Sequence, residues 1–253
     1  MGKIIAVANQ KGGVGKTTTA VSLAAYLAQS GRSILLVDAD PQGNASSGVG
    51  VRAGKQTLYE ALLMQCGMDS TVSKTEFKHL HVSPSDTRLA GAELELVGVE
   101  RREYRMRAVL SAVKDQYQYL IIDCPPSLGL LTVNALVAAQ SVLIPIQCEY
   151  YALEGVTALM DTVRRVRHGI NPSLEIEGVL LTMYDGRTNL SLQVAAEVKK
   201  HFKKQVFRTA IPRNVRLGEA PSHGEPISSY DPKSQGGMAY QALAEEIIRN
   251  NER

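Results

Sequence analysis

Residues 3–18 read KIIAVANQKGGVGKTT, and this stretch determines the fold class. Its first part, residues 3–9, is a nearly continuous apolar run with isoleucine and valine, which is typical of a strand buried on both faces. A glycine-rich turn follows, and residues 17–29 then show a helical pattern that ends at Ser30-Gly31, a glycine of the kind that closes helices. This order of strand, glycine-rich turn and helix predicts a phosphate-binding loop.

The turn itself has the chemistry that a phosphate requires. Its glycines allow backbone N–H groups to turn inward without a Cβ clash, and the start of the next helix adds free N–H groups and a dipole. Lys16 supplies a positive charge for the β- and γ-phosphates, and the Thr17 hydroxyl can bind Mg²⁺. The predicted phosphate-binding residues are Lys11, Gly12, Gly13, Val14, Gly15, Lys16, Thr17 and Thr18.

Strands and helices alternate along the rest of the chain. Buried strands are expected at residues 33–37, 119–122, 141–147, 176–182 and 205–209, with a weaker one at 80–83. Helices are expected at residues 58–64, 103–115, 130–139, 152–167, 191–202 and 236–249, and loops at 39–57 and 211–234. The alternation predicts an α/β fold, a doubly wound and mostly parallel sheet with helices on both faces. Because no change of composition marks a linker, a single domain is expected over residues 1–253.

Composition excludes several classes of protein. With 44% hydrophobic and 21% charged residues among 253, the chain has an ordinary globular composition and is neither disordered nor collagen-like. Cys66, Cys124 and Cys148 are too few and too far apart for a disulfide framework, which favours a reduced, cytoplasmic compartment. The long apolar stretch at residues 128–146 contains polar residues and Pro145, so it predicts a buried helix and strand rather than a membrane span.

Three aspartates follow predicted strands. Asp38 and Asp40 come directly after the strand at residues 33–37, and Asp123 ends the strand at residues 119–122. In open α/β sheets ligands bind at the carboxyl ends of the strands, so these acids are expected beside the phosphate loop. A single aspartate after a strand is usually a turn or helix cap. Three of them near a phosphate loop favour metal and water chemistry.

The loop departs from the general motif, which has its first glycine where Gln10 stands in this chain, and it has a lysine at position 11. This pattern resembles the deviant Walker A motif of the ParA/MinD class of P-loop ATPases. Over nearly its whole length the chain is similar to the chromosomal ParA family, also called Soj. The stretches that support this are residues 9–19, 35–44, 119–131, 147–155 and 211–224, whereas residues 52–80 match less specifically. The resemblance implies ATP and Mg²⁺ as cofactors and slow basal hydrolysis of ATP to ADP and phosphate.

The resemblance also implies roles for single residues. Lys11 is expected to reach across the interface of an ATP-bound homodimer to the partner's nucleotide, and Lys11, Lys16 and Asp40 are the expected catalytic residues. Asp40 is expected to orient the attacking water. The expected metal residues are Thr17, Asp38 and Asp123, the last two acting through water.

The segment Ile-Pro-Arg-Asn at residues 211–214 resembles the adenine-contacting loop of the same family. Pro212 and Asn214 are therefore expected to contact the base. Their spacing alone would indicate only a turn.

A basic stretch lies in the carboxy-terminal third, where residues 198–217 include no acidic residue. It crosses a predicted helix, strand and loop, so a single solvated helix face does not account for it. Such a patch would neutralise DNA phosphates without reading the sequence. The resemblance implies non-specific binding of double-stranded DNA by the ATP dimer. The candidate DNA-binding residues are Arg187, Lys199, Lys200, Lys203 and Arg216.

The first functional hypothesis is an ATP-dependent DNA-segregation switch for chromosome or plasmid partitioning, cytoplasmic and nucleoid-associated in a bacterium. A ParB-type centromere-binding protein would stimulate its hydrolysis and release. A MinD-like membrane switch that positions division is a second hypothesis, but the chain ends in acidic residues without a bulky apolar tail, so no stable membrane association is expected. A third is a reductase of the nitrogenase iron-protein type, and a fourth is the same switch acting on another cargo, such as a protein body.

Overall fold

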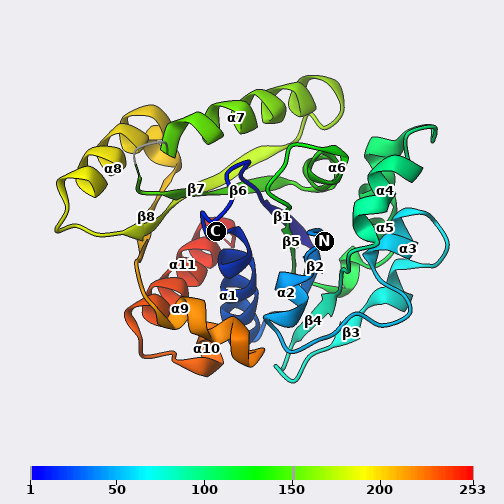
Figure 1. The fold of residues 1–253 in the computed structure, drawn as a ribbon, viewed down its shortest axis with the longest axis horizontal. Coiled ribbons are helices and arrows are strands. Elements are labelled where there is room, and N and C mark those ends of the chain that lie inside the picture. Colours follow the sequence, from blue (N-terminus) through cyan, green and yellow to red (C-terminus); the bar gives the residue numbers. More distant parts are fainter. Residues whose placement is uncertain (1, 150–151, 253) are drawn as a thin grey trace.

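The computed structural model describes residues 2–149 and 152–252, and within that part of the chain it contains one eight-stranded sheet (Figure 1). The strand order is β3-β4-β2-β5-β1-β6-β7-β8. The strands are β1 (Lys3–Val7), β2 (Ile34–Asp38), β3 (Ser73–Lys74), β4 (Leu80–Ser83), β5 (Tyr119–Asp123), β6 (Ser141–Gln147), β7 (Glu175–Tyr184) and β8 (Val206–Pro212). Neighbouring strands are parallel except for the antiparallel pair β3 and β4. The predicted, mostly parallel α/β sheet is confirmed.

Helices cover both faces of this sheet (Figure 1). They are α1 (Lys16–Gln29), α2 (Asn44–Ser47), α3 (Leu58–Leu62), α4 (Leu89–Glu95), α5 (Arg105–Ser111), α6 (Leu130–Ala138), α7 (Ala152–Gly169), α8 (Asn189–Phe202), α9 (Arg216–Glu219), α10 (Ile227–Tyr230) and α11 (Gln235–Asn251). Successive residues of a strand point to opposite faces, so Ile4 and Ala6 pack in one core with α5 to α7, whereas Ile5 and Val7 pack in the other with α1 and α11. This explains why β1 is apolar throughout.

The structure adds short elements that the sequence pattern did not predict. The expected loop at residues 39–57 contains α2, and the expected loop at 211–234 contains α9, α10 and a 3₁₀ turn. Helix α4 and strand β3 were also missed, and the helix expected at 103–115 is α5 between two 3₁₀ turns. Elements of two to seven residues are too short to show a hydrophobic period, and tertiary contacts determine them instead.

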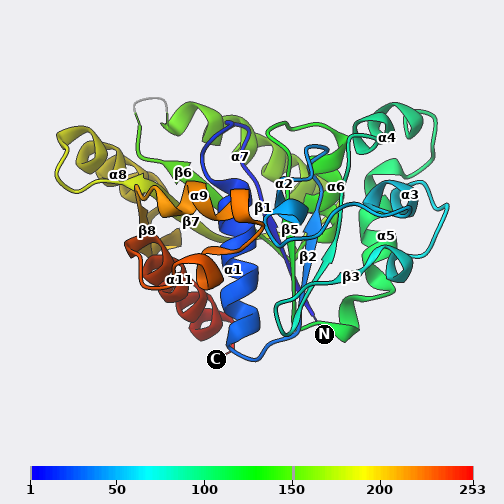
Figure 2. The same cartoon turned by 60° about the horizontal axis from the view of Figure 1, so that its bottom comes forward.

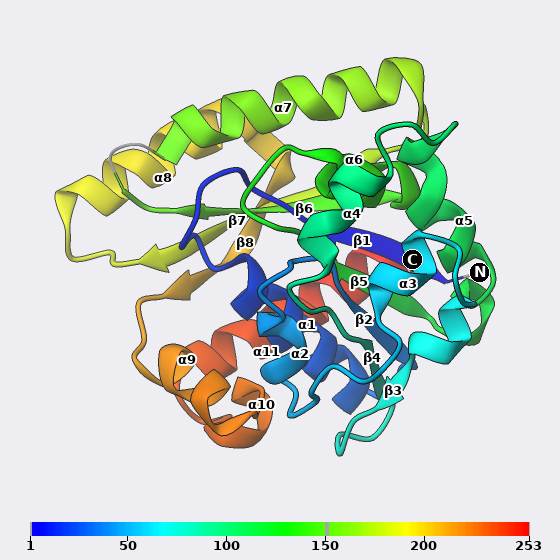
Figure 3. The same cartoon turned by 45° about the vertical axis from the view of Figure 1, so that its right-hand side comes forward.

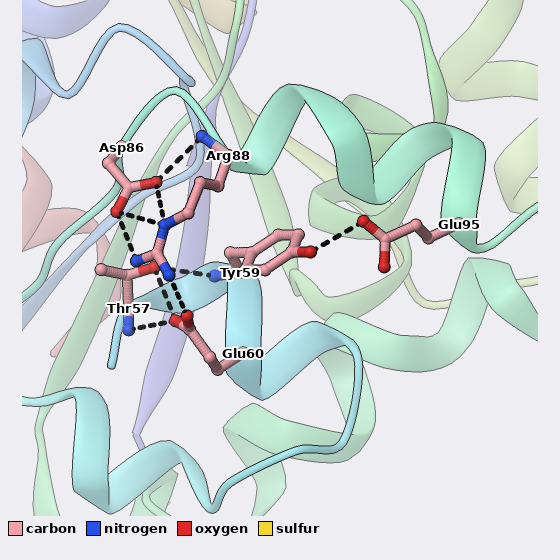
Figure 4. A network of polar contacts seen from close by, with 6 residues as sticks. All are labelled: Thr57, Tyr59, Glu60, Asp86, Arg88 and Glu95. Atoms are coloured by element: carbon pink, nitrogen blue, oxygen red, sulfur yellow. Dashed lines mark hydrogen bonds and ion pairs between the residues drawn. The ribbon is translucent and has the colours of Figure 1, made fainter. Parts of the chain in front are cut away.

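A network of polar side chains joins the short helices α3 and α4 at one corner of the molecule (Figure 4). Thr57 caps α3, where its side chain and that of Glu60 form a capping box. Arg88, the residue before α4, forms an ion pair with Glu60 and another with Asp86 at 2.6 Å. The Tyr59 hydroxyl donates a hydrogen bond of 2.7 Å to Glu95 at the end of α4. The corner lies to the side of the sheet, next to α5 (Figure 3).

The parallel order of the strands separates two edges of the sheet. The carboxyl ends of β1, β2, β5, β6, β7 and β8 lie at one edge, which we call the carboxyl edge. The start of β1 and the end of α11 lie at the other end of the molecule, which we call the amino edge (Figure 2), and the Lys3 ammonium donates a hydrogen bond to Asn251 there. The glycine-rich loop follows β1 near the middle of the sheet and therefore lies at the carboxyl edge.

In the part of the chain that the structure describes, no helix combines the length and the apolar character needed to cross a membrane. The apolar stretch at residues 128–146 forms α6 and β6, as predicted.

Candidate functional site

The glycine-rich loop has the backbone shape that a phosphate cradle requires. Gly13 and Gly15 have φ angles of 73° and 87°, in the left-handed region that favours glycine. A Cβ atom built on Gly12 or Gly13 would meet no protein atom within 4 Å, so the space above the loop is open. Helix α1 begins at Lys16, directly after the loop, and the first N–H groups of a helix have no partner within it. The loop therefore fits a phosphate chain.

Lys16 lies beneath this open space. Its side chain is buried, and its ammonium group donates a hydrogen bond of 3.0 Å to the backbone carbonyl of Lys11. Burial lowers the pKa of Lys16, and the carboxylates of Asp123 and Asp40 offset part of this effect. The lysine is thus a buried cation next to acids, at the position where the sequence predicts phosphate binding.

Asp123 and Asp38 end neighbouring strands. They are paired in the parallel register of β2 and β5, and both are fully buried. Neither oxygen of Asp123 has a hydrogen-bond partner among the described residues. Burial raises its pKa well above the usual range, and the facing Asp38 adds to this. Thr17 lies close enough to favour the ionised form, although no hydrogen bond of ordinary geometry joins the two side chains.

Asp38 is held firmly by the turn that follows it. One of its oxygens accepts hydrogen bonds from the amide and the hydroxyl of Ser46, at 2.8 and 2.6 Å, and the other accepts one from the Asp40 amide. Burial raises the pKa of Asp38 to about 6, and the Ser46 contacts oppose the rise. Asp40 accepts a hydrogen bond from the Gln42 amide at 2.9 Å. Ser46, on α2, was not identified from the sequence because it lies in an expected loop.

These residues fit a magnesium ion bound largely through water. The unpartnered, buried carboxylate of Asp123 and the nearby Thr17 hydroxyl provide oxygen donors, which Mg²⁺ prefers. Within residues 2–149 and 152–252 no group of three or more His, Cys, Asp or Glu side chains could enclose a metal ion by itself. Magnesium usually keeps several waters and binds substrate phosphates, so such a cage is not required.

Two hollows flank the loop. One has a volume of about 270 Å³ and is lined by Gly15, Thr18, Pro212 and Asn214, among others. The structure therefore brings both predicted base-contacting residues next to the loop, since β8 ends at Pro212 at the carboxyl edge. The other hollow, of about 370 Å³, is lined by Thr17, Thr18 and residues of α2, α9 and α10.

Lys11 lies at the mouth of the loop. Its ammonium group is 3.9 Å from the carboxylate of Glu149, which is also 3.5 Å from the guanidinium of Arg213. Two-thirds of the Lys11 side chain is buried and one-third is exposed. Part of the stretch 147–155, on which the family resemblance also rests, lies outside the described residues, namely residues 150 and 151.

The predicted DNA-binding residues fall into two groups. Arg187 follows β7 and Arg216 follows β8, so both lie at the carboxyl edge. Lys199 and Lys200 are in the last turn of α8 and Lys203 directly follows it. Helix α8 spans about 21 Å, at 1.5 Å per residue, and leads to the start of β8, where Val206 pairs with Val179 in the middle of β7. The structure therefore separates the arginines from the lysines, which the linear sequence placed together.

The charges of these groups are partly compensated. Arg187 forms an ion pair of 2.8 Å with Asp185, and Arg216 one of 2.8 Å with Glu219. In the described residues, Lys199 and Lys203 have no acidic partner within ion-pair distance, and Lys200 lies 4.0 Å from a carboxylate oxygen of α8. All of these basic residues are exposed.

Sequence reasoning also missed two residues that hold the loop. The amide of Asn9 donates a hydrogen bond of 2.7 Å to the carbonyl of Pro145 on β6, and its oxygen accepts one from the Lys11 amide. The hydroxyl of Thr182 on β7 donates a hydrogen bond of 2.8 Å to the carbonyl of Val14. Both partners are more than 130 positions away along the chain, so only the order of the strands could have indicated them.

In this mostly parallel sheet, a glycine-rich loop and a buried lysine follow β1, and a buried aspartate ends the neighbouring strand β5. These features define a P-loop nucleoside triphosphatase. Comparison with known proteins makes this class specific. A family model described as an AAA domain matches residues 2–176. The chain is 57% identical to the sporulation initiation inhibitor protein Soj of Bacillus subtilis, with 99% of this chain and 100% of that protein covered. It is 54% identical to the chromosome partitioning protein ParA of Myxococcus xanthus, covering 99% and 89%. The chain belongs to the Soj/ParA family of chromosome-partitioning ATPases.

A solved structure agrees on the fold. The protein named cobyrinic acid a,c-diamide synthase from Mycobacterium smegmatis, with bound ADP and magnesium, superposes with a TM-score of 0.88 at 36% identity. The comparison covers 100% of this chain and 97% of that one. Its name denotes another activity, but its identity to this chain is lower than that of the partitioning proteins. The family resemblance predicted from the Lys11–Thr17 pattern is confirmed.

Proposed function

We propose that this ATPase is a switch, closed by ATP into a homodimer that binds DNA without sequence preference. The observation that supports this most directly is the single continuous edge that holds the phosphate loop, the exposed part of Lys11 and the two arginines. A ligand at the loop therefore lies near the surface that would meet both a second copy and DNA. We also propose that residues 1–253 act as one domain, since the two cores share the same sheet.

The chemistry requires positioning and charge neutralisation more than covalent help. Lys16 neutralises the phosphates, and the backbone amides of residues 12–17 position them. The Thr17 hydroxyl would bind Mg²⁺, and Asp123 and Asp38 would hold its water shell. The bound ion would neutralise charge on the β- and γ-phosphates. Asp40, fixed in its turn by the Gln42 amide, orients the attacking water. Pro212 and Asn214 contact the adenine in the smaller hollow.

Dimer closure places Lys11 on the nucleotide of the second copy. Its contact with Glu149, at 3.9 Å and partly exposed, is weak and easily exchanged for a phosphate. ATP supplies a γ-phosphate for this lysine and ADP does not, which gives the two states different dimer affinities. A ligand shifts such an equilibrium only by its differential affinity for the two states.

The switch then serves partitioning. The arginine group at the carboxyl edge and the lysine group at the end of α8 neutralise DNA phosphates, and a ParB-type centromere-binding protein stimulates hydrolysis and release. The protein is accordingly cytoplasmic and associated with the nucleoid. The chromosome is the proposed cargo, because the relatives from Myxococcus xanthus and Treponema pallidum, at 54% and 51% identity, are both named for chromosome partitioning.

A membrane-positioning role is disfavoured by the contacts of α11. Its apolar residues Leu243, Ala244 and Ile247 are buried in the core of the sheet, and its Glu246 accepts hydrogen bonds from the β8 backbone at Arg208 and Thr209. A helix that anchors to a bilayer needs a free apolar face. Pelleting with anionic liposomes in the presence of ATP would reveal such an anchor.

DNA co-sedimentation with ATP, with ADP and without nucleotide tests the switch. DNA binding is expected only with ATP, and Arg216→Glu is expected to weaken it without changing nucleotide affinity. Lys78→Glu is the matched control, since Lys78 is exposed on the β3–β4 hairpin at the opposite end of the sheet from β8. Equal binding in all three nucleotide states would refute the switch.

The dimer is tested by light scattering with the slow variant Asp40→Ala, in which ATP persists. A dimer is expected with ATP and a monomer with ADP, and Lys11→Ala is expected to stay monomeric in both. The same mass in every state would contradict the proposed closure.

A further inference from the structure

A buried hydroxyl outside the loop controls one peptide of the phosphate cradle. Thr182 lies near the end of β7, and its hydroxyl donates a hydrogen bond of 2.8 Å to the Val14 carbonyl. The exposed fraction is 2% for Thr182 and 1% for Val14, so water does not compete for this contact. Loss of this hydrogen bond would leave the buried Val14 carbonyl without a partner, which costs free energy. The contact is therefore expected to persist.

The direction of this carbonyl fixes the next N–H group. The carbonyl of Val14 and the N–H of Gly15 belong to the same planar trans peptide, and in such a peptide the two groups point in opposite directions. Because the carbonyl points at β7, the Gly15 N–H points away from β7, to the phosphate side of the loop. Among the described residues, no protein acceptor takes a hydrogen bond from this N–H.

The peptide needs such a restraint because of its glycine. Gly15 has a φ of 87°, and glycine populates positive and negative φ about equally. Rotating the Val14–Gly15 peptide by about half a turn is therefore sterically cheap at Gly15. The rotation would place a carbonyl oxygen, rather than an N–H group, against the phosphates, and would repel them.

The other end of the loop has a different anchor. Asn9 joins the Lys11 amide to the Pro145 carbonyl of β6. Asn9 thus fixes where the loop leaves β1, whereas Thr182 fixes the orientation of a peptide in the cradle itself. The methyl group of Thr182 also lies near Gly15, 3.8 Å from the position that a Cβ there would take.

We propose that Thr182 is a positioning residue that holds the Val14–Gly15 peptide with its N–H towards the nucleotide phosphates. It thereby sets the affinity for both ATP and ADP without taking part in the chemical step. This inference rests on the proposed function in one respect, namely that the loop binds nucleotide phosphates.

The substitution Thr182→Val removes the hydroxyl and keeps the shape and the methyl group. Calorimetric titration with Mg·ADP and with Mg·ATP is expected to show a loss of about fivefold in affinity for both, the equivalent of one hydrogen bond. KM for ATP is expected to rise by the same factor while kcat stays within twofold. Thr182→Ser restores the hydroxyl and is expected to restore both affinities.

Thr71→Val is the matched control. Thr71 is also buried, and its hydroxyl also donates a hydrogen bond of 2.8 Å to a backbone carbonyl, that of Met68, far from the loop. This variant is expected to lose stability but to bind nucleotide as the wild type does. If Thr182→Val also kept wild-type affinity, the positioning role would be overturned. A serine variant as weak as the valine variant would overturn it too, because the affinity would then not follow the hydroxyl.

The peptide orientation can also be observed directly. In protein labelled with ¹⁵N-glycine, the Gly15 amide signal is expected to shift strongly on addition of Mg·ADP, and to broaden in free Thr182→Val through peptide exchange. A sharp, unchanged signal in the variant would contradict the proposal. If Thr182→Val does not fold, Thr182→Ala removes the same hydroxyl for these measurements. Failure of the wild type itself to bind either nucleotide would refute the proposed function, and is distinguished by the titration of the unaltered chain.

Discussion

A buried carboxylate at the amino edge of the sheet and one at the carboxyl edge differ in their hydrogen-bond partners. At the amino edge, Glu177 accepts hydrogen bonds from Ser141 and Asn251, at 2.6 and 2.7 Å, and forms an ion pair of 2.6 Å with Lys3. At the carboxyl edge, the side chain of Asp123 is also buried and, in the described part of the chain, has no hydrogen-bond partner. The protein therefore supplies partners to both oxygens of Glu177, and among the described residues it supplies none to Asp123.

The difference separates stability from function. Glu177 joins β1, β6, β7 and the end of α11, so its contacts close the fold around the sheet. Asp123 costs stability, since a buried carboxylate without partners is expensive. A ligand that pairs with it recovers that cost on binding, and stabilises the folded state by mass action. The following variants test this division, from the largest expected effect to the smallest.

Removing the buried cation of the carboxyl edge should abolish function and spare the fold. Lys16→Ala is expected to lower nucleotide affinity at least about 100-fold and to reduce ATP hydrolysis to background, because the phosphates lose their main positive charge. Calorimetry and phosphate release measure both. Lys3→Ala, at the amino edge, is the control and should instead lower stability while it keeps nucleotide affinity. A Lys16 variant that still hydrolyses ATP would contradict the assigned role.

Neutralising Asp123 should raise the Tm of the free protein and slow its ATP hydrolysis. Asp123→Asn is expected to slow ATP hydrolysis about 100-fold, because the magnesium shell loses a charged partner. Without nucleotide its Tm is expected to rise by roughly 2–4 °C, the equivalent of about 1 kcal/mol, since an unpaired buried charge disappears. Differential scanning calorimetry measures the shift. Asp115→Asn, on the exposed surface, should change neither quantity, and a lower Tm in Asp123→Asn would show that this acid is stabilising.

Removing the carboxylate of Glu177 should lower the stability of the fold and leave nucleotide binding unchanged. Glu177→Ala breaks three polar contacts of a side chain that is only 4% exposed, and Lys3, at 28%, keeps part of its hydration. The expected loss is about 2 kcal/mol, or roughly 4–8 °C in Tm, with unchanged nucleotide affinity. Glu175→Ala, an exposed neighbour on β7, should stay within about 0.5 kcal/mol of the wild type. A loss of ATP binding in Glu177→Ala would mean that the edges are coupled.

The sequence predicted features that depend on local residues and missed those that depend on contacts between distant parts of the chain. The strands and the loop at residues 11–18 were predictable, because buried parallel strands are apolar throughout and the loop chemistry is local. The anchors Asn9 and Thr182 were not, because their partners come close only through the strand order. The basic residues show the limit most clearly. Positions 199–216 are neighbours in sequence, but strand β8 lies between the lysines at the end of α8 and Arg216 and separates them.

That separation allows the two basic groups to be distinguished by their acidic partners. Arg187 is hydrogen-bonded to Asp185, and this contact lowers the pKa of Asp185 to about 2. The acid therefore stays ionised at any pH used for DNA binding and compensates the arginine. In the lysine group, Glu197 of α8 lies 4.0 Å from the ammonium of Lys200.

Asp185→Asn removes the compensating charge and is expected to raise DNA affinity about threefold in the ATP state, with a steeper dependence on salt, because one more cation can release counterions. Glu197→Gln makes the same change of charge beside the lysines. If the arginine group contacts DNA, only the first variant strengthens binding, and if the lysine group does, only the second. An increase in both would show that DNA contacts both groups. Fluorescence anisotropy with a labelled duplex at several salt concentrations measures these effects, and wild-type affinity in both variants would contradict DNA contact by either group.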